Sequence, residues 1–316
     1  MNTTRTARWR LHPTALASLT LIAGLAHAQQ TLPSVEVVGA TPLPGIGVPK
    51  DQIPSNVQTL GDKRLRQAQS LNLPDAMTTL LPSANVNEVQ GNPYQMDVNY
   101  RGFTASPLLG TPQGLSVFQD GVRINESFGD VVNWDLLPQS AIASLQLIPG
   151  SNPLFGLNTL GGALALYTKS GRDYPGGGVE LSGGSFGRKT LQFEHGGVSG
   201  AWDYFATANL SKERGWAQHN PSRVEQFFGK AGYQAPGDRL EVSLTAASNR
   251  LEGTQTLPPS FFDDRTQAYT YPDQNKNRLA MLSVQGSHML SREMVLGGNA
   301  YLRRFHNGNV SSNGND

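Results

Sequence analysis

The sequence contains no cysteine among its 316 residues, which excludes disulfides, thiolate nucleophiles and thiolate metal sites. It also lacks an excess of either charge: 25 lysines and arginines face 24 aspartates and glutamates, so no basic surface for nucleic acid is expected. The histidines that follow residue 28 are never three or four positions apart, so the sequence does not support a zinc site. Glycine is abundant at 35 residues, and this composition favours a turn-rich β protein over helical membrane spans.

Three short motifs that could carry chemistry are weak. Residues 183–187 have the G-x-S-x-G pattern of a nucleophile elbow around Ser185, but that motif needs a helix after the serine, and here strand patterns lie on both sides. Residues 229–231 lack the glycine spacing and the Ser/Thr of a phosphate loop. The acidic residues between 263 and 273 are better explained as a solvated loop than as a cation site. We therefore expect no catalytic residue, no metal and no cofactor.

The N-terminus has the parts of an export signal. Arg5, Arg8 and Arg10 precede the apolar stretch 14–25, and residues 26–28 fit the A-x-A cleavage pattern. About 12 apolar residues cannot cross a ~30 Å hydrocarbon core, which needs about 20, so we expect residues 1–28 to be a cleaved signal peptide. Residues 29–54 are polar and proline-rich, as expected for a flexible leader.

Residues 55–172 have the pattern of a compact α+β domain. Asp120-Gly121 between two apolar runs predicts a hairpin. Pro74, Asp75 and Pro82 mark the start and the end of a short helix over 72–82. Residues 145–148 and 163–168 predict two further strands. The side chains expected on the core face of the helix are Ala76, Met77, Leu80 and Leu81.

Several sequence blocks follow one another in a fixed order between residues 100 and 169. They are Tyr100–Phe103, Phe118–Val122, Leu147–Gly150, Leu154–Gly156, and Gly161–Ala163 with Thr168-Lys169. Together they resemble the plug domain of TonB-dependent outer-membrane receptors. The plug-motif residues that the resemblance implies are Arg101, Gly102, Asp120, Gly121, Pro149, Gly150, Gly156, Gly161 and Gly162.

The resemblance also implies a function and a location. Such a plug sits inside a barrel of about 22 strands in the bacterial outer membrane. The receptor takes up a scarce extracellular ligand, such as a siderophore-like chelate, cobalamin or a carbohydrate, and an inner-membrane TonB complex drives the uptake. We therefore expect a transporter rather than an enzyme, with the TonB protein, outer-membrane lipid and a small ligand as its partners.

A short β-prone run lies in the leader. In the family, such a run after the signal is the TonB box, which pairs with the TonB protein by strand addition, so that backbone groups supply the affinity. An ordinary linker that carries a few valines is the alternative. The run consists of Ser34, Val35, Glu36, Val37, Val38 and Gly39.

Two charged plug residues have two interpretations each. Arg101 and Asp120 could belong to a buried polar network between the plug and the barrel wall, or they could fix turns locally. The local role is favoured for Asp120, which is part of its Asp-Gly hairpin, and both roles stay open for Arg101.

From residue 173 onward the chain alternates with a period of two. Trp202, Tyr204 and Leu210 share one face, and Asp203 and Thr207 lie on the other. An apolar outer face and a polar inner face over about 10 residues are typical of a transmembrane barrel strand, although a soluble sandwich could alternate in the same way.

The lengths of the connections agree with a barrel. The links at 197–200, 235–237 and 289–292 are short, whereas 212–222, 251–276 and the tail from 306 are long and polar. The link at 184–187 is short where a long one is expected. We count about seven strands, too few to close around a plug, so we expect residues 173–316 to be the N-terminal part of an incomplete antiparallel barrel.

The ligand-contact residues are predicted from the family's use of apical plug loops and long external loops. Their aromatic rings could stack on a chelate or a sugar, or could form an interfacial girdle. Two other classes remain: a soluble exported binding protein with a plug-like domain, and a secreted serine hydrolase that uses Ser185. The predicted ligand contacts are Phe103, Asn125, Trp134, Phe261, Phe262, Tyr269 and Tyr271.

Overall fold

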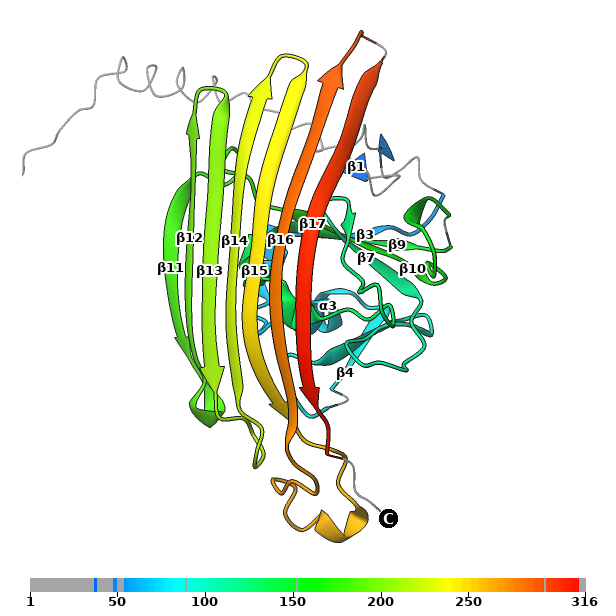
Figure 1. Ribbon diagram of the computed structural model, residues 1–316, viewed down its shortest axis with the longest axis vertical. Helices are drawn as coiled ribbons and strands as arrows, with labels where there is room; N and C mark the ends of the chain where they lie inside the picture. The colour runs from blue at the N-terminus through cyan, green and yellow to red at the C-terminus, as the bar shows by residue number, and fades with distance from the viewer. Residues whose placement is uncertain are drawn as a thin grey trace, which may run out of the picture. The chain divides into compact units, whose positions relative to one another are not determined.

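The computed structural model describes residues 37–38, 48–49, 54–88, 90–151, 153–292 and 294–312 (Figure 1). Small sheets and short helices occupy residues 54–172, which we call the plug segment, and one large sheet occupies residues 176–310, which we call the wall. A two-stranded sheet of β1 (Val37–Val38) and β2 (Val48–Pro49) precedes both.

The plug segment contains two sheets. The larger has the order β3-β9-β10-β7-β8, in which β10 runs parallel to β7 and antiparallel to β9. The smaller is an antiparallel sheet of β4, β5 and β6. The strands are β3 (Gln58–Gly61), β4 (Ala84–Glu88), β5 (Met96–Tyr100), β6 (Phe103–Ala105), β7 (Leu115–Gln119), β8 (Val122–Arg123), β9 (Ile142–Pro149) and β10 (Gly162–Thr168). The helices are α2 (Asp62–Gln67), α3 (Leu73–Leu80), and the 3-10 turns η2 (Trp134–Leu136), η3 (Gln139–Ala141) and η4 (Pro153–Phe155).

The predicted short helix is α3, and its local signals explain its bounds. The Asn72 side chain accepts a hydrogen bond from the Asp75 amide at 3.0 Å and so caps the N-terminus. The Asp75 carboxylate accepts from the Leu71 amide at 2.9 Å, in the first turn where a negative charge is favourable. Ala76 and Met77 are fully buried, as expected for the core face.

Two tight hairpins depend on left-handed backbone positions. Asp120 and Gly121 join β7 to β8 with φ values of 46° and 82°, and this confirms the predicted hairpin. Arg101 and Gly102 join β5 to β6 in the same way, with φ values of 52° and 86°. Positive φ at both central positions gives the twist that matches two paired strands.

The wall is a seven-stranded antiparallel sheet in which every strand pairs with its sequence neighbour. The long connections, 214–221 and 254–272, leave one end of this sheet together with the short turn between β11 and β12, and the short links after β12, β14 and β16 leave the other end (Figure 1). The strands are β11 (Gly176–Gly183), β12 (Lys189–Ser199), β13 (Trp202–Glu213), β14 (Ser222–Ala235), β15 (Asp238–Gly253), β16 (Asp273–Met289) and β17 (Val295–Val310).

The wall has an apolar outward face and a polar inward face, as predicted. Leu240 and Leu244 are exposed on the outward face, whereas Glu241, Ser243 and Thr245 are buried on the inward face. The main core cluster consists mostly of plug-segment side chains and also includes wall side chains. The inward face of the wall therefore packs against the plug segment. The wall members of this cluster are Ala247, Leu279 and Met281.

Two elements differ from the expectation. Helix α2 was not predicted, because Leu65 is its only apolar residue and no periodicity marks it. Strand β17 continues to Val310, although the polar composition from residue 306 predicted a loop. Its polar side chains are instead bonded within the wall, as described below. Among the described residues, no helix is long and apolar enough to cross a membrane.

Candidate functional site at the plug–wall interface

A row of amide side chains crosses the inward face of the wall. We call it the amide belt, with one residue from each of the strands β13 to β17. In adjacent strands, Asn249 stands opposite Asn277, and Asn277 stands opposite Asn307. Asn307 donates to the Asn277 side-chain oxygen at 2.6 Å, and Asn209 donates to that of Gln226 at 2.9 Å. The amide belt consists of Asn209, Gln226, Asn249, Asn277 and Asn307.

The amide belt converges on one plug residue, Asp135 of η2. Its carboxylate accepts hydrogen bonds from the side-chain amides of Asn249 at 2.8 Å and Asn277 at 3.0 Å. Its backbone carbonyl accepts from Gln226 at 2.6 Å and from Asn249 at 2.7 Å. Three neighbouring wall strands therefore hold a single buried residue of the plug segment.

The Asp135 carboxylate is a buried acid without a cation. It is 2% exposed, and within the described part of the chain no lysine or arginine forms an ion pair with it. Burial raises the pKa of Asp135 to about 6, although the hydrogen bonds from Asn249 and Asn277 act in the opposite direction. The nearby Glu126 carboxylate raises this pKa further, and Glu126 is itself paired with Arg303 of β17.

Two buried lysines also form ion pairs between the plug segment and the wall. Lys169, which is 1% exposed, lies 3.1 Å from Asp62 of α2 and 2.9 Å from Glu194 of β12. Lys230 of β14 lies 3.2 Å from Asp120. Buried pairs of this kind are strongly disrupted when one partner is removed, because the other charge is left uncompensated.

A plug loop reaches the long connections of the wall. The Gly91 carbonyl accepts hydrogen bonds from Trp216 at 3.2 Å and Asn220 at 2.6 Å, both in the 214–221 connection. Asn92 is fully buried and donates to the Ser222 hydroxyl at 2.9 Å. Residues 90–95 are therefore the loop of the plug segment that is bonded to the predicted external loops.

The two long connections also contact each other. The rings of His219 and Tyr271 stack with centroids 3.8 Å apart, and the Gln218 amide donates to the Thr266 carbonyl at 2.7 Å. The two connections and the plug loop 90–95 thus lie together at the same end of the wall, and we call them the loop cluster.

A polar cavity of about 600 Å³ lies between α2 and α3 on one side and β11 to β13 on the other. Asp135 and Gln226 line it, together with Lys169 and Arg188. The cavity gives water a route toward one end of the amide belt.

The plug-motif residues have mainly structural positions. Asp120 fixes its hairpin and accepts hydrogen bonds within the plug segment from the Thr168 amide at 2.9 Å and the Thr168 hydroxyl at 2.5 Å. Because it also pairs with Lys230 of the wall at 3.2 Å, it combines the local role with the plug–wall role. Arg101 is exposed on its turn, with its guanidinium 5.1 Å from the Tyr100 ring. A Cβ on Gly161 would lie 2.5 Å from the Phe103 side chain, and one on Gly162 would lie 2.4 Å from the Ile148 carbonyl. The other predicted residues, Gly102, Gly121, Pro149, Gly150 and Gly156, lie at turns or strand ends.

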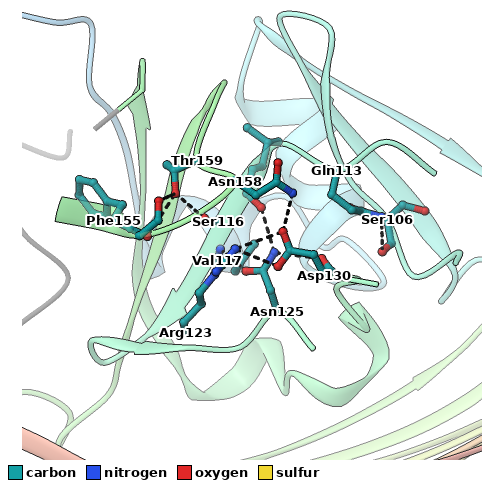
Figure 2. Close-up of polar contacts among 12 residues, drawn as sticks. Ser106, Gln113, Ser116, Val117, Arg123, Asn125, Asp130, Phe155, Asn158 and Thr159 are labelled. Atoms are coloured by element: carbon teal, nitrogen blue, oxygen red, sulfur yellow. Dashed lines mark hydrogen bonds and ion pairs between the residues drawn. The ribbon is translucent and has the colours of Figure 1, made fainter. Parts of the chain in front are cut away.

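Three of the predicted ligand contacts serve the plug segment itself. Trp134 is 2% exposed, and its indole donates to the Ala105 carbonyl at 3.2 Å. Asn125 is bonded to the Val117 amide at 2.8 Å within a network around Asp130, which Figure 2 shows. Phe103 is partly buried against the core and covers glycines 114 and 161. In this conformation these three side chains support the loops rather than present a binding surface.

The other predicted contacts lie together on the connection 254–272. Phe262, Tyr269 and Tyr271 are more than half exposed, at 54%, 52% and 55%. Phe261 packs edge-on against Tyr269 with centroids 5.5 Å apart. These aromatic side chains therefore belong to the cluster formed by the two long connections and the plug loop 90–95, and they remain candidates for ligand contact.

Two further predictions concern the run 34–39 and Ser185. Of the run 34–39, only the backbone of Val37 and Val38 is described, as strand β1, and the other four residues lie outside the described residues. Ser185 lies in the exposed turn between β11 and β12, with strands on both sides. This context differs from the strand-turn-helix of a nucleophile elbow.

The belt residues and the loop 90–95 were not singled out from the sequence. Asn249, Asn277 and Asn307 occupy inward positions of the alternating strands, and this pattern is a usable signal. Their alignment, however, depends on the strand register, and their common partner Asp135 depends on how the plug segment packs.

Comparisons with known proteins agree with this architecture. Residues 49–163 match the family model of the TonB-dependent Receptor Plug Domain. The ferric aerobactin receptor of Klebsiella pneumoniae is 27% identical over 191 residues, which cover 58% of this chain and 24% of that protein. The matched region thus spans about a quarter of that curated relative, and the same holds for the ferric aerobactin receptor of Escherichia coli.

Solved structures show the same fold at low sequence identity. The unliganded ferric citrate transporter FecA superposes with a TM-score of 0.68 at 11% identity, over 81% of this chain and 40% of that chain. The ferripyoverdine receptor of the outer membrane of Pseudomonas aeruginosa, bound to ferripyoverdine, gives a TM-score of 0.66 at 14% identity, over 87% and 39%.

The fold and the site define a plug domain that packs against an antiparallel sheet of the outer-membrane barrel type. The plug-domain match over residues 49–163 and these relatives show that the chain is similar to TonB-dependent receptors, with a plug domain followed by seven strands that resemble part of their barrel sheet.

Proposed function

We propose that the chain is part of a receptor that takes up a ferric siderophore across the bacterial outer membrane, with energy from the TonB system. The observation that carries this proposal is the plug domain held against the polar inward face of a sheet whose outward face is apolar. An apolar outward face suits lipid, and a polar inward face suits a hydrated passage that the plug must clear.

The plug–wall contacts suggest how the passage is kept closed. Asp135 with the amide belt, Lys169 with Glu194, and Lys230 with Asp120 tie the plug to the wall at separate points. Ligand binding at the loop cluster favours a state in which the TonB box, residues 34–39, is released to TonB, because the ligand binds that state more tightly. TonB then adds to this run as a strand and pulls on the plug.

The relatives support an iron chelate as the ligand. The two curated relatives are ferric aerobactin receptors, and the solved neighbours include a ferric citrate transporter and a ferripyoverdine receptor. The exposed rings of Phe262, Tyr269 and Tyr271 in the loop cluster offer flat apolar surfaces to such a ligand.

Uptake and binding of labelled ferric siderophores by iron-limited cells that express the complete gene test this proposal. Deletion of residues 34–39 should abolish uptake and leave surface binding unchanged, since the deleted run lies outside the loop cluster. Uptake that persists after the deletion would overturn the role of the TonB box. Failure of cells with the intact gene to accumulate any ferric siderophore would overturn the proposed ligand class.

A further inference from the structure

Basic side chains form a row on the outward face of the wall. We call it the basic stripe, which consists of Lys189, Lys212, Arg223, Arg250, Lys276 and Arg278. The strand register makes five of its members direct neighbours, and Arg278 follows Lys276 by two residues on β16. Lys189 stands opposite Lys212, Lys212 opposite Arg223, Arg223 opposite Arg250, and Arg250 opposite Lys276. The stripe therefore crosses five adjacent strands, β12 to β16.

The stripe is exposed and only partly neutralised. All six side chains are exposed. Glu225 pairs with Arg223 at 2.5 Å and Glu252 pairs with Arg250 at 2.7 Å, whereas the described residues provide no carboxylate partner for the three lysines or for Arg278. Six cations against two carboxylates leave a net charge of +4. Like charges directly opposite each other destabilise a sheet, so this arrangement calls for an anion.

The stripe borders an apolar surface on the same face. Leu191 and Leu210 stand opposite each other. Each lies two residues along its strand from Lys189 or Lys212, on the side away from the long connections. Together with Phe227 they are 40%, 48% and 41% exposed. A molecule that lies along the wall here meets cations at one end and apolar side chains at the other.

We propose that the basic stripe binds the phosphorylated head group of an outer-leaflet lipid whose acyl chains lie on the adjoining apolar surface. Phosphate matches the donors, because arginine and lysine are the usual phosphate ligands. The apolar surface favours a lipid over a free phosphate, which could use only the cations. The inference rests on the proposed outer-membrane location, but it concerns the lipid side of the wall rather than the transport path.

The test measures lipid retention by the complete gene product in phosphatidylcholine nanodiscs that contain a diphosphorylated glycolipid or its dephosphorylated form. Native mass spectrometry counts the glycolipid bound to each protein. The wild-type protein should retain the phosphorylated form selectively, even with inorganic phosphate in excess. Lys212→Gln with Lys276→Gln should weaken retention about 30-fold, at about 1 kcal/mol for each cation. Arg292→Gln, which removes a cation at the short-link end of the same sheet, should retain the lipid as the wild type does.

The outcomes separate the lipid site from transport. Equal retention of both glycolipids by the wild-type protein would overturn the proposal whatever the variants do. Displacement by inorganic phosphate would overturn the lipid in favour of a free anion, and equal losses in the double variant and Arg292→Gln would overturn the site. Siderophore uptake is measured on the same variants. If the wild-type protein retains no lipid selectively but takes up siderophore, only this inference is overturned. If it retains the lipid but takes up no siderophore, only the proposed function is overturned.

Discussion

The Asp135 carboxylate lies 3.0 Å from the side-chain amide of Asn277, and this hydrogen bond crosses from the plug domain to the wall. Donor and acceptor are both buried, and Asn277 is in turn fixed by Asn307. The proposed transport requires the plug to move, and at this point the plug is held by neutral amides and one carboxylate, without a lysine or an arginine. Such contacts exchange readily with water once the interface opens.

Asn277→Ala should weaken the attachment of η2 to the wall. The Asp135 carboxylate would lose one of its two amide partners while remaining buried, at a cost of about 1.5–3 kcal/mol for a hydrogen bond to a charged group. Hydrogen exchange of residues 133–137 in the complete protein measures the change. Asn309→Ala is the matched control, because Asn309 donates to Asn275 and not to Asp135. Equal exchange in the two variants would show that the bond to Asp135 contributes nothing.

The plug attachment should depend on pH. The pKa of Asp135 is about 6 in the docked state because of burial, above the usual value of 3.8, so protonation favours docking. The extra stability is fully present below pH 3.8 and is lost as pH rises through 6, by about 3 kcal/mol in all. Opening free energies from hydrogen exchange between pH 4 and 7 should therefore fall with pH. A similar slope in Asp135→Asn would assign the dependence to another group.

Lys169→Met should destabilise the plug–wall contact between α2 and β12. The change leaves Asp62 and Glu194 without their shared buried cation, at a cost of about 3 kcal/mol, although Arg66 remains 2.6 Å from Asp62 and 3.5 Å from Glu194. Protease sensitivity of residues 62–67 provides the measurement. Arg172→Met removes a half-exposed cation 3.7 Å from Asp203 and should cost less than about 1 kcal/mol. A larger effect for Arg172 than for Lys169 would contradict this ranking.

Gly162→Ala should disrupt the plug sheet. Gly162 has a φ of 148°, and an added Cβ would lie 2.4 Å from the Ile148 carbonyl, so β10 could not pair with β9 without moving. A loss of more than about 2 kcal/mol is expected, measured by urea denaturation of the complete protein. Gly298→Ala on β17, where a Cβ meets nothing within 4 Å, is the control and should change little.

Local signals in the sequence predicted much of the fold. The Asp120-Gly121 hairpin, helix α3 and the alternating wall strands depend on neighbouring residues, and they agree with the structure. Helix α2 and the end of β17 were missed because few apolar residues mark them. The amide belt could not be predicted, since Asn249, Asn277 and Asn307 align through register and meet Asp135 only after the plug packs. The burial of Trp134 has the same non-local origin.

The central claim, that the plug must leave the wall for uptake, is tested most directly by a reversible tether. The Ser140 and Thr207 hydroxyls join η3 to β13 at 2.8 Å, and the chain contains no cysteine, so Ser140→Cys with Thr207→Cys introduces a single disulfide. The oxidised double variant should bind ferric siderophore but not take it up, and a reductant should restore uptake. Ser140→Cys alone should transport under both conditions. Normal uptake by the oxidised double variant would contradict the account.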